Sequence, residues 1–190
     1  MPSFAQFAGL AIVVLSLGYF ANALPTPTFF GADVLSCTGK DAYSLVFAKV
    51  IVEFQACIKA ISACKDIVEV KAQIDILCSI FHQCGDKLVA IGAGVFVTAQ
   101  AKTEIIACVT GIITITVRAC LALVFKFGLA VCVELFAKVD IAIQYFLLKL
   151  DLCIVGIVAV IAKSIISLTV GILFELDLKL CIETLGLKFM

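Results

Sequence analysis

Residues 28 to 190 contain no proline, because the three prolines of the chain are Pro2, Pro25 and Pro27. Proline breaks or kinks the interior of a helix, so a proline-free stretch of this length can form long uninterrupted helices. Alanine, leucine and lysine recur along it and turn dipeptides are missing, which favours a mostly all-α fold. Glycine then supplies the breaks or close-packing points, which we expect at Gly39, Gly85, Gly128, Gly156 and Gly171.

We therefore predict a compact or extended bundle of about five to six helices. They are expected near residues 41–64, 66–84, 87–109, 112–127, 129–152 and 154–172. The stretch SIFHQCGDK places His82 in a last helical turn, Gly85 at a C-cap and Asp86 at the next start, which predicts a helical hairpin at Gly85. FELDLKLCIE (174–183) and ITITVR (113–118) alternate apolar and polar residues, so a short β element near the C-terminus stays open.

The first residues are typical of a secretory signal. An apolar run is followed by Ala21-Asn22-Ala23, a cleavage site of the A-x-A type, and then by LPTPT. No lysine or arginine precedes the run, so an uncleaved anchor is the alternative. We expect residues 1–23 to be a signal peptide, 24–40 an N-terminal segment and 41–190 one hydrophobic helical domain that is secreted.

The composition is unusually apolar, at 64% hydrophobic residues with a mean hydropathy of +1.23. A domain of this size buries only about 70% of the surface of its unfolded chain. Apolar side chains must therefore stay outside or pack against another copy, a lipid or an air–water boundary. The 14 basic and 14 acidic residues give zero net charge, which removes the repulsion between copies.

Charge spacing argues against a polytopic membrane protein. After the signal, the longest stretches without a charged side chain are residues 88–101 and 105–117. Both are shorter than the 18 or more residues that a membrane span needs. The basic residues are scattered and form no cluster that could bind the phosphates of a nucleic acid, so we expect no nucleic-acid partner.

The stretch AKVDIAIQYFLLKLDLCIV (137–155) mixes single polar residues with continuous apolar ones. At about 100° per residue, one polar line is formed by Glu134, Lys138 and Lys149, and an opposite line by Asp140, Gln144 and Asp151. Two thin polar stripes therefore separate two apolar faces. This pattern predicts a helix with apolar neighbours on both sides, from its own chain and from further copies.

The ten cysteines all follow the expected cleavage site, and an even number behind a signal peptide favours disulfides. Their pairing is open, and the alternative is that each acts as a small buried apolar residue. The candidates are Cys37, Cys57, Cys64, Cys78, Cys84, Cys108, Cys120, Cys132, Cys153 and Cys181.

No constellation of residues points to an enzyme. His82 is the only histidine and lies between Cys78 and Cys84, but this spacing is not that of a standard zinc site, and a fourth ligand would have to come from elsewhere. His82 and Cys84 are two residues apart, so their side chains point about 200° away from each other on a helix. Every acidic residue stands singly among apolar ones, and no phosphate loop is present. We expect no catalytic residue, no metal and no cofactor.

The stretch ANALPTPTFFGADVLSCTGK and the apolar, glycine-punctuated body resemble a loosely defined group of small secreted proteins of mushroom-forming fungi. These proteins are rich in Val, Leu, Ile and Ala, with an LPTP-like start and isolated cysteines. The resemblance implies a place at cell walls or surfaces and carries no catalytic motif.

Three functions remain open from the sequence. We expect an extracellular structural protein that self-assembles into oligomers or polymers, or coats a surface, through helix packing between copies. A carrier of lipid or another hydrophobic ligand would instead enclose an apolar cavity. A membrane-active, pore-forming protein is the third reading.

Overall fold

The computed structural model describes residue 35 and residues 37–93 and 95–187, and these contain seven helices and no strand. The helices are α2 (Ala42–Ala63), α3 (Ile67–Ile91), α4 (Ala99–Phe127), α5 (Leu129–Cys153), α6 (Ile157–Ser164), α7 (Ser167–Glu175) and α8 (Lys179–Leu185). The all-α prediction is confirmed, while the predicted number of five to six helices was too low. The predicted signal peptide, residues 1–23, lies outside the described residues, as does most of the segment 24–40.

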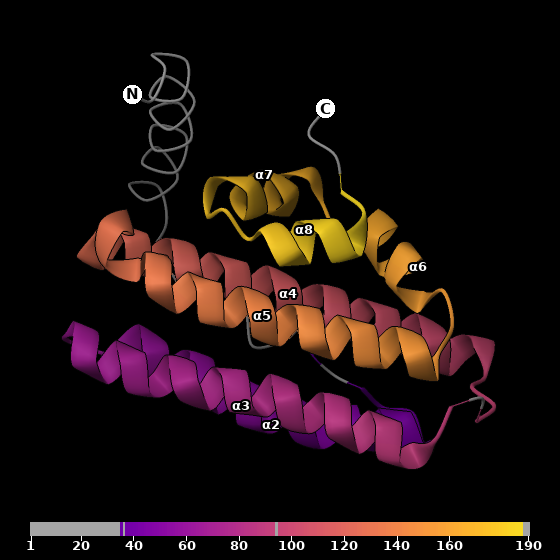
Figure 1. The fold of residues 1–190 in the computed structure, drawn as a ribbon. Helices are drawn as coiled ribbons and strands as arrows, with labels where there is room; N and C mark the ends of the chain where they lie inside the picture. The colour runs from indigo at the N-terminus through magenta and orange to yellow at the C-terminus, as the bar shows by residue number, and fades with distance from the viewer. Residues whose placement is uncertain (1–34, 36, 94, 188–190) are drawn as a thin grey trace, which may run out of the picture. The chain divides into compact units, whose positions relative to one another are not determined.

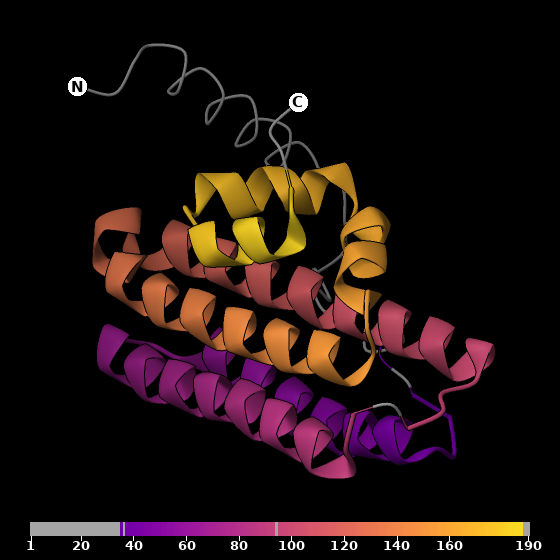
Figure 2. The same cartoon turned by 45° about the vertical axis from the view of Figure 1, so that its right-hand side comes forward.

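The helices form three layers (Figure 1). α2 and α3 make a hairpin that packs on α4 and α5, and α6, α7 and α8 cover the opposite side of α4 and α5. The turned view shows the same order, with α4 and α5 between the two outer layers (Figure 2). The most extensive contact joins α3 to α5. A helix of the middle layer therefore needs a broad apolar surface that contacts both outer layers, which accounts for part of the high hydropathy.

The starts of the long helices follow ordinary capping chemistry. The carboxylate of Asp41 accepts hydrogen bonds from the backbone N–H of Tyr43 and Ser44, and that of Asp66 does the same for Val68 and Glu69. At the start of α4 the cap is Thr98, whose hydroxyl accepts a hydrogen bond from the backbone N–H of Ala101. These caps satisfy N–H groups that have no partner inside the helix.

The predicted hairpin at Gly85 is wrong, because α3 continues through this residue to Ile91. Gly85 instead marks a close approach of α3 to α5, since a Cβ there would stand 3.1 Å from Cε1 of Tyr145 and 3.2 Å from Cγ of Lys149. The chain reverses at Gly92, whose φ of +102° lies in the region that favours glycine. The two helices predicted at 87–109 and 112–127 are accordingly replaced by the single helix α4.

The possible β elements are also corrected. ITITVR lies inside α4, where Ile113, Thr116 and Val117 are buried. FELDLKLCIE spans the end of α7 and the start of α8, joined by a turn in which Asp177 has a φ of +56°. Both segments are helical, apart from the turn, because burial against other helices outweighs the strand preference of their alternating pattern. The helix predicted at 154–172 is divided into α6 and α7, which meet at an angle of 99°.

The core between the first two layers contains a row of aromatic rings. Phe54 lies 6.3 Å from Phe81, Phe81 lies 5.8 Å from Phe146, and Phe146 lies 6.3 Å from Phe47, measured between ring centroids. Two of these pairs are edge-to-face, the arrangement that ring quadrupoles prefer. The row ties α2 and α3 to α5 and fixes which face of α5 points inward.

A candidate association surface on α5

α5 has one buried face and one exposed face, divided by the two polar stripes. The buried face includes Leu135, Val139, Ile143, Phe146 and Leu150. On the exposed face, Ile141 is 53% exposed, Leu148 51% and Leu152 62%. With Ala137 and with Val155 in the turn after α5, these three residues form a surface that we call the outer face of α5. In Figure 1 α5 lies at the front of the middle layer, between α3 and α8.

The first polar stripe fastens α5 to α3. The ammonium group of Lys138 lies 2.6 Å from the carboxylate of Asp75, and the hydroxyl of Tyr145 donates to Asp86 at 2.5 Å. The ring of His82 lies 4.8 Å from that of Tyr145. The hydrogen bond to Asp75 raises the pKa of Lys138, and the one to Asp86 raises the pKa of Tyr145. These polar contacts border the outer face along its α3 side.

The second polar stripe fastens α5 to the third layer. Asp140 is only 5% exposed and accepts hydrogen bonds from the backbone N–H of Leu180 at 2.9 Å and of Cys181 at 2.8 Å. Asp151 accepts from the N–H of Val158 in α6 at 3.2 Å. Burial raises the pKa of Asp140 more than these two N–H donors lower it. The charged residues that we expected to separate two apolar faces therefore also bind α5 to α3, α6 and α8.

A second exposed apolar patch surrounds the turn between α4 and α5. Phe125, Leu129, Val131 and Val133 are each about half exposed around Gly128. Gly128 has a φ of +86°, a conformation that L side chains rarely adopt. The tight turn leaves these four side chains on the surface at the start of α5, one helix length away from Leu152.

All ten cysteines are free thiols in the structure, so the predicted disulfides stay a prediction. Nine are buried and Cys78 is partly exposed, which agrees with the alternative interpretation of cysteine as a small apolar residue. Burial raises the pKa of Cys57 and Cys78 to about 11 and that of Cys84, Cys120 and Cys181 to about 12. These five are protonated thiols at neutral pH.

The sequence predicted His82 in the last turn of a helix, and this prediction is wrong. It lies inside α3, with Nδ1 2.8 Å from the carbonyl oxygen of Cys78 in the preceding turn. Within the described ranges, no group of three or more His, Cys, Asp or Glu residues is placed to hold a metal ion.

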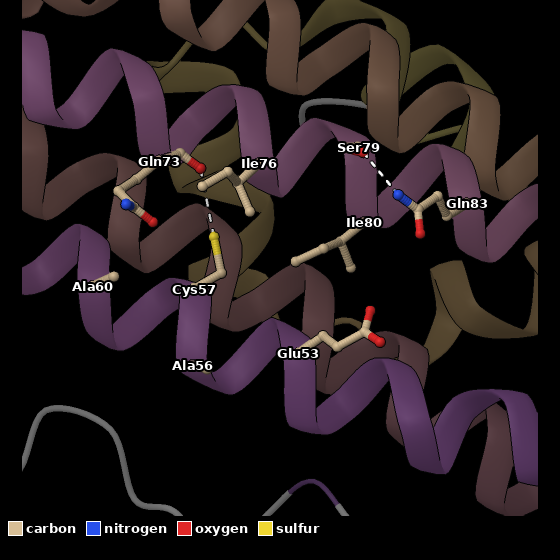
Figure 3. Close-up of a pocket in the computed structure, with 9 residues that line it drawn as sticks. All are labelled: Glu53, Ala56, Cys57, Ala60, Gln73, Ile76, Ser79, Ile80 and Gln83. Atoms are coloured by element: carbon tan, nitrogen blue, oxygen red, sulfur yellow. Dashed lines mark hydrogen bonds between the residues drawn. The ribbon is translucent and has the colours of Figure 1, made fainter.

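A groove of about 500 Å³ lies between α2 and α3, away from the outer face of α5. Figure 3 shows Cys57 and Glu53 on α2 facing Gln73, Ile76 and Ile80 on α3. The thiol of Cys57 donates to the carbonyl oxygen of Gln73 at 3.4 Å. The remaining lining residues are Ala56, Ala60, Ser79 and Gln83. Small and polar residues thus alternate with isoleucine, and the groove is not a uniformly apolar ligand pocket.

By length and composition, α4 could cross a bilayer, and the bent pair of α6 and α7 passes the same test as a broken span. Half of the most apolar window of α4 is buried inside the protein. The core helix of a water-soluble protein has the same properties, so this observation does not separate the two environments.

No protein-family model, characterised protein or solved structure matches this chain. The fold and the surface of α5 therefore carry the functional argument on their own.

Proposed function

We propose that this chain is an extracellular structural protein that self-assembles or coats a surface, and that copies associate through the outer face of α5. One observation carries the proposal: the apolar face between the two polar stripes remains half exposed after α5 has packed against its own chain. The extracellular location rests on the signal-like residues 1–23.

A second copy is the occupant that fits this face best. The chain has zero net charge, so copies do not repel each other over distance. The cations along the edge of the face are engaged within the chain, Lys138 with Asp75 and Lys149 over the ring of Tyr145. An anionic membrane surface would instead favour free lysines and arginines on the rim.

The exposed area sets the strength of such a contact. Completing the burial of Ile141, Leu148, Leu152 and Val155 contributes about 3–6 kcal/mol, taking about half of the 1.5–3 kcal/mol for each full side chain. Two copies that meet through the same face double this to about 6–12 kcal/mol, which is comparable to the cost of association, about 4–15 kcal/mol. One such contact is therefore weak and reversible. The patch around Gly128 supplies a second, separate contact, which a polymer needs and a closed dimer does not.

Replacing Leu148 by lysine tests the contact. The change removes apolar burial from both copies, about 1.5–3 kcal/mol in total, and weakens self-association about 10- to 150-fold. Leu45→Lys is the matched control, because Leu45 is a leucine of similar exposure, 54%, on α2. Sedimentation velocity without detergent, with circular dichroism to verify folding, measures the effect.

The result separates the three functions. Assemblies in the wild type and in Leu45→Lys that dissociate in Leu148→Lys support the proposal. Equal assembly in both variants contradicts association through α5. A monomeric wild type that releases lipid on extraction favours a carrier, and leakage of liposomes at nanomolar protein favours a membrane-active protein.

A further inference from the structure

The segment before α2 lies along one face of α4. Leu35 is buried, and its Cδ2 lies 2.6 Å from the point where a Cβ on Gly111 would stand. Three residues further along the segment, the hydroxyl of Thr38 donates to the carboxylate of Glu104 at 3.4 Å. Gly111 and Glu104 are two helical turns apart and share a face of α4. Cys108 lies between them on that face, and Cys37 lies between Leu35 and Thr38 on the segment.

These contacts bring two thiols together. Cys37 and Cys108 are both buried, and each thiol is the largest influence on the pKa of the other. We propose that Cys37 and Cys108 are a redox pair that closes into an intramolecular disulfide, joining the segment before α2 to α4. This pairing is independent of the association through α5.

The surroundings give the two sulfurs different roles. The hydrogen bond from Cys108, with a smaller contribution from Ser44, lowers the pKa of Cys37 to about 7, against burial and the carboxylates of Glu104 and Asp41, which raise it. The pKa of Cys108 is raised, first because its thiol donates to Cys37 and then because it is buried. Thiolate is the nucleophile in disulfide exchange, and a thiol with a pKa near the ambient pH attacks best. Cys37 is therefore the attacking residue and Cys108 the resolving one.

Cys37 is the less buried member of the pair, at 8% exposed against 2% for Cys108. It precedes Thr38 and Lys40, which are exposed. Beside these residues, a cleft of about 340 Å³ separates the segment from the first turns of α4.

The oxidant is a low-molecular-weight disulfide such as oxidised glutathione. The Cys37 thiolate attacks one sulfur of this disulfide, forms a mixed disulfide and releases one glutathione thiolate. Cys108 then attacks the Cys37 sulfur, its proton passes to the second departing glutathione thiolate, and the protein disulfide remains. Two electrons leave the protein and reduce one glutathione disulfide to two glutathione thiols.

The experiment exposes the purified full chain to oxidised glutathione at neutral pH, traps free thiols with iodoacetamide and maps bridges by peptide mass spectrometry. We expect a peptide that joins Cys37 to Cys108, while Cys120 and Cys132 are alkylated only after unfolding. Cys37→Ser loses the bridge. Cys108→Ser also loses it but accumulates glutathione on Cys37, a readout that a purely structural effect would not produce.

Gly111→Ala tests the geometry without removing a thiol. Its new methyl group would displace Leu35, so the Cys37–Cys108 bridge is expected to form more slowly. Gly171→Ala is the matched control, because it adds the same methyl group in α7 with no heavy atom within 4 Å, and its rate should equal that of the wild type. A wild-type protein that forms no Cys37–Cys108 bridge, or a rate in Gly111→Ala equal to that of the control, overturns the proposal.

Discussion

Replacing Asp140 by alanine tests whether one buried carboxyl group holds α8 on α5. The change removes the acceptor of two backbone N–H groups, those of Leu180 at 2.9 Å and Cys181 at 2.8 Å. A buried backbone N–H left without an acceptor costs about 1–3 kcal/mol, so the gross loss for the two is about 2–6 kcal/mol. Part of it is offset because a buried carboxylate no longer has to be desolvated. We expect the free energy of unfolding to fall by about 2–4 kcal/mol.

Urea denaturation followed by circular dichroism measures the fall, and hydrogen exchange at Leu180 and Cys181 localises it to α8. Asp75→Ala is the control, because the ion pair of Asp75 with Lys138 is exposed and such pairs contribute about 0–1 kcal/mol. A loss below about 0.5 kcal/mol in Asp140→Ala, with unchanged exchange at Leu180, would refute the reasoning.

The effect of Asp140 also depends on pH. Burial raises the pKa of Asp140 above the ordinary 3.8, so the folded protein holds this proton more tightly than the unfolded chain does. The resulting stability is fully present below pH 3.8 and is lost as the pH rises through the folded-state pKa. The asparagine side chain of Asp140→Asn does not titrate, and its carbonyl oxygen still accepts hydrogen bonds. The stability of the wild type relative to Asp140→Asn should therefore decline as the pH is raised from 3 towards 7.

Two further predictions concern the ends of helices. Asp41→Ala removes the cap of α2 and should cost about 0.5–2 kcal/mol at pH 7. Burial raises the pKa of Asp41, but the hydrogen bonds from Ser44 and Tyr43 lower it overall, so this loss should disappear in urea titrations as the pH falls through the lowered pKa. Gly128→Ala forces an L side chain to a φ of +86° and should destabilise by about 1–3 kcal/mol in the same assay. Gly171→Ala, in open space within α7, should be neutral or stabilise by up to about 1 kcal/mol, and equal effects at the two glycines would contradict the assignment.

Local signals predicted the helices whose ends are set locally. α2 and α5 lie within about two residues of their predicted bounds, since the Asp41 cap and the Gly128 turn are visible in the sequence. The prediction at Gly85 was wrong because the pair glycine-aspartate occurs both at the end of a helix and inside a helix where another helix packs closely. What distinguishes the two is Tyr145, sixty residues away along the chain.

The candidate surface was predictable in outline only. The spacing of Lys138, Lys149, Asp140 and Asp151 indicated two apolar faces, and α5 has one buried face and one exposed face. The partner of Asp140 was not predictable, because it is the backbone of a short helix that begins about forty residues later. Backbone N–H groups of a distant segment leave no signature in the sequence.

The middle position of α4 and α5 determines how a disturbance spreads through the protein. The extensive contacts of α6, α7 and α8 outside their own layer are all with α4 and α5. Detachment of α6, α7 and α8 from α4 and α5 therefore leaves the row of phenylalanines between α2, α3 and α5 in place. The two outer layers are thermodynamically coupled through α4 and α5, and local unfolding of α8 is a lower-energy excursion than unfolding of the whole molecule.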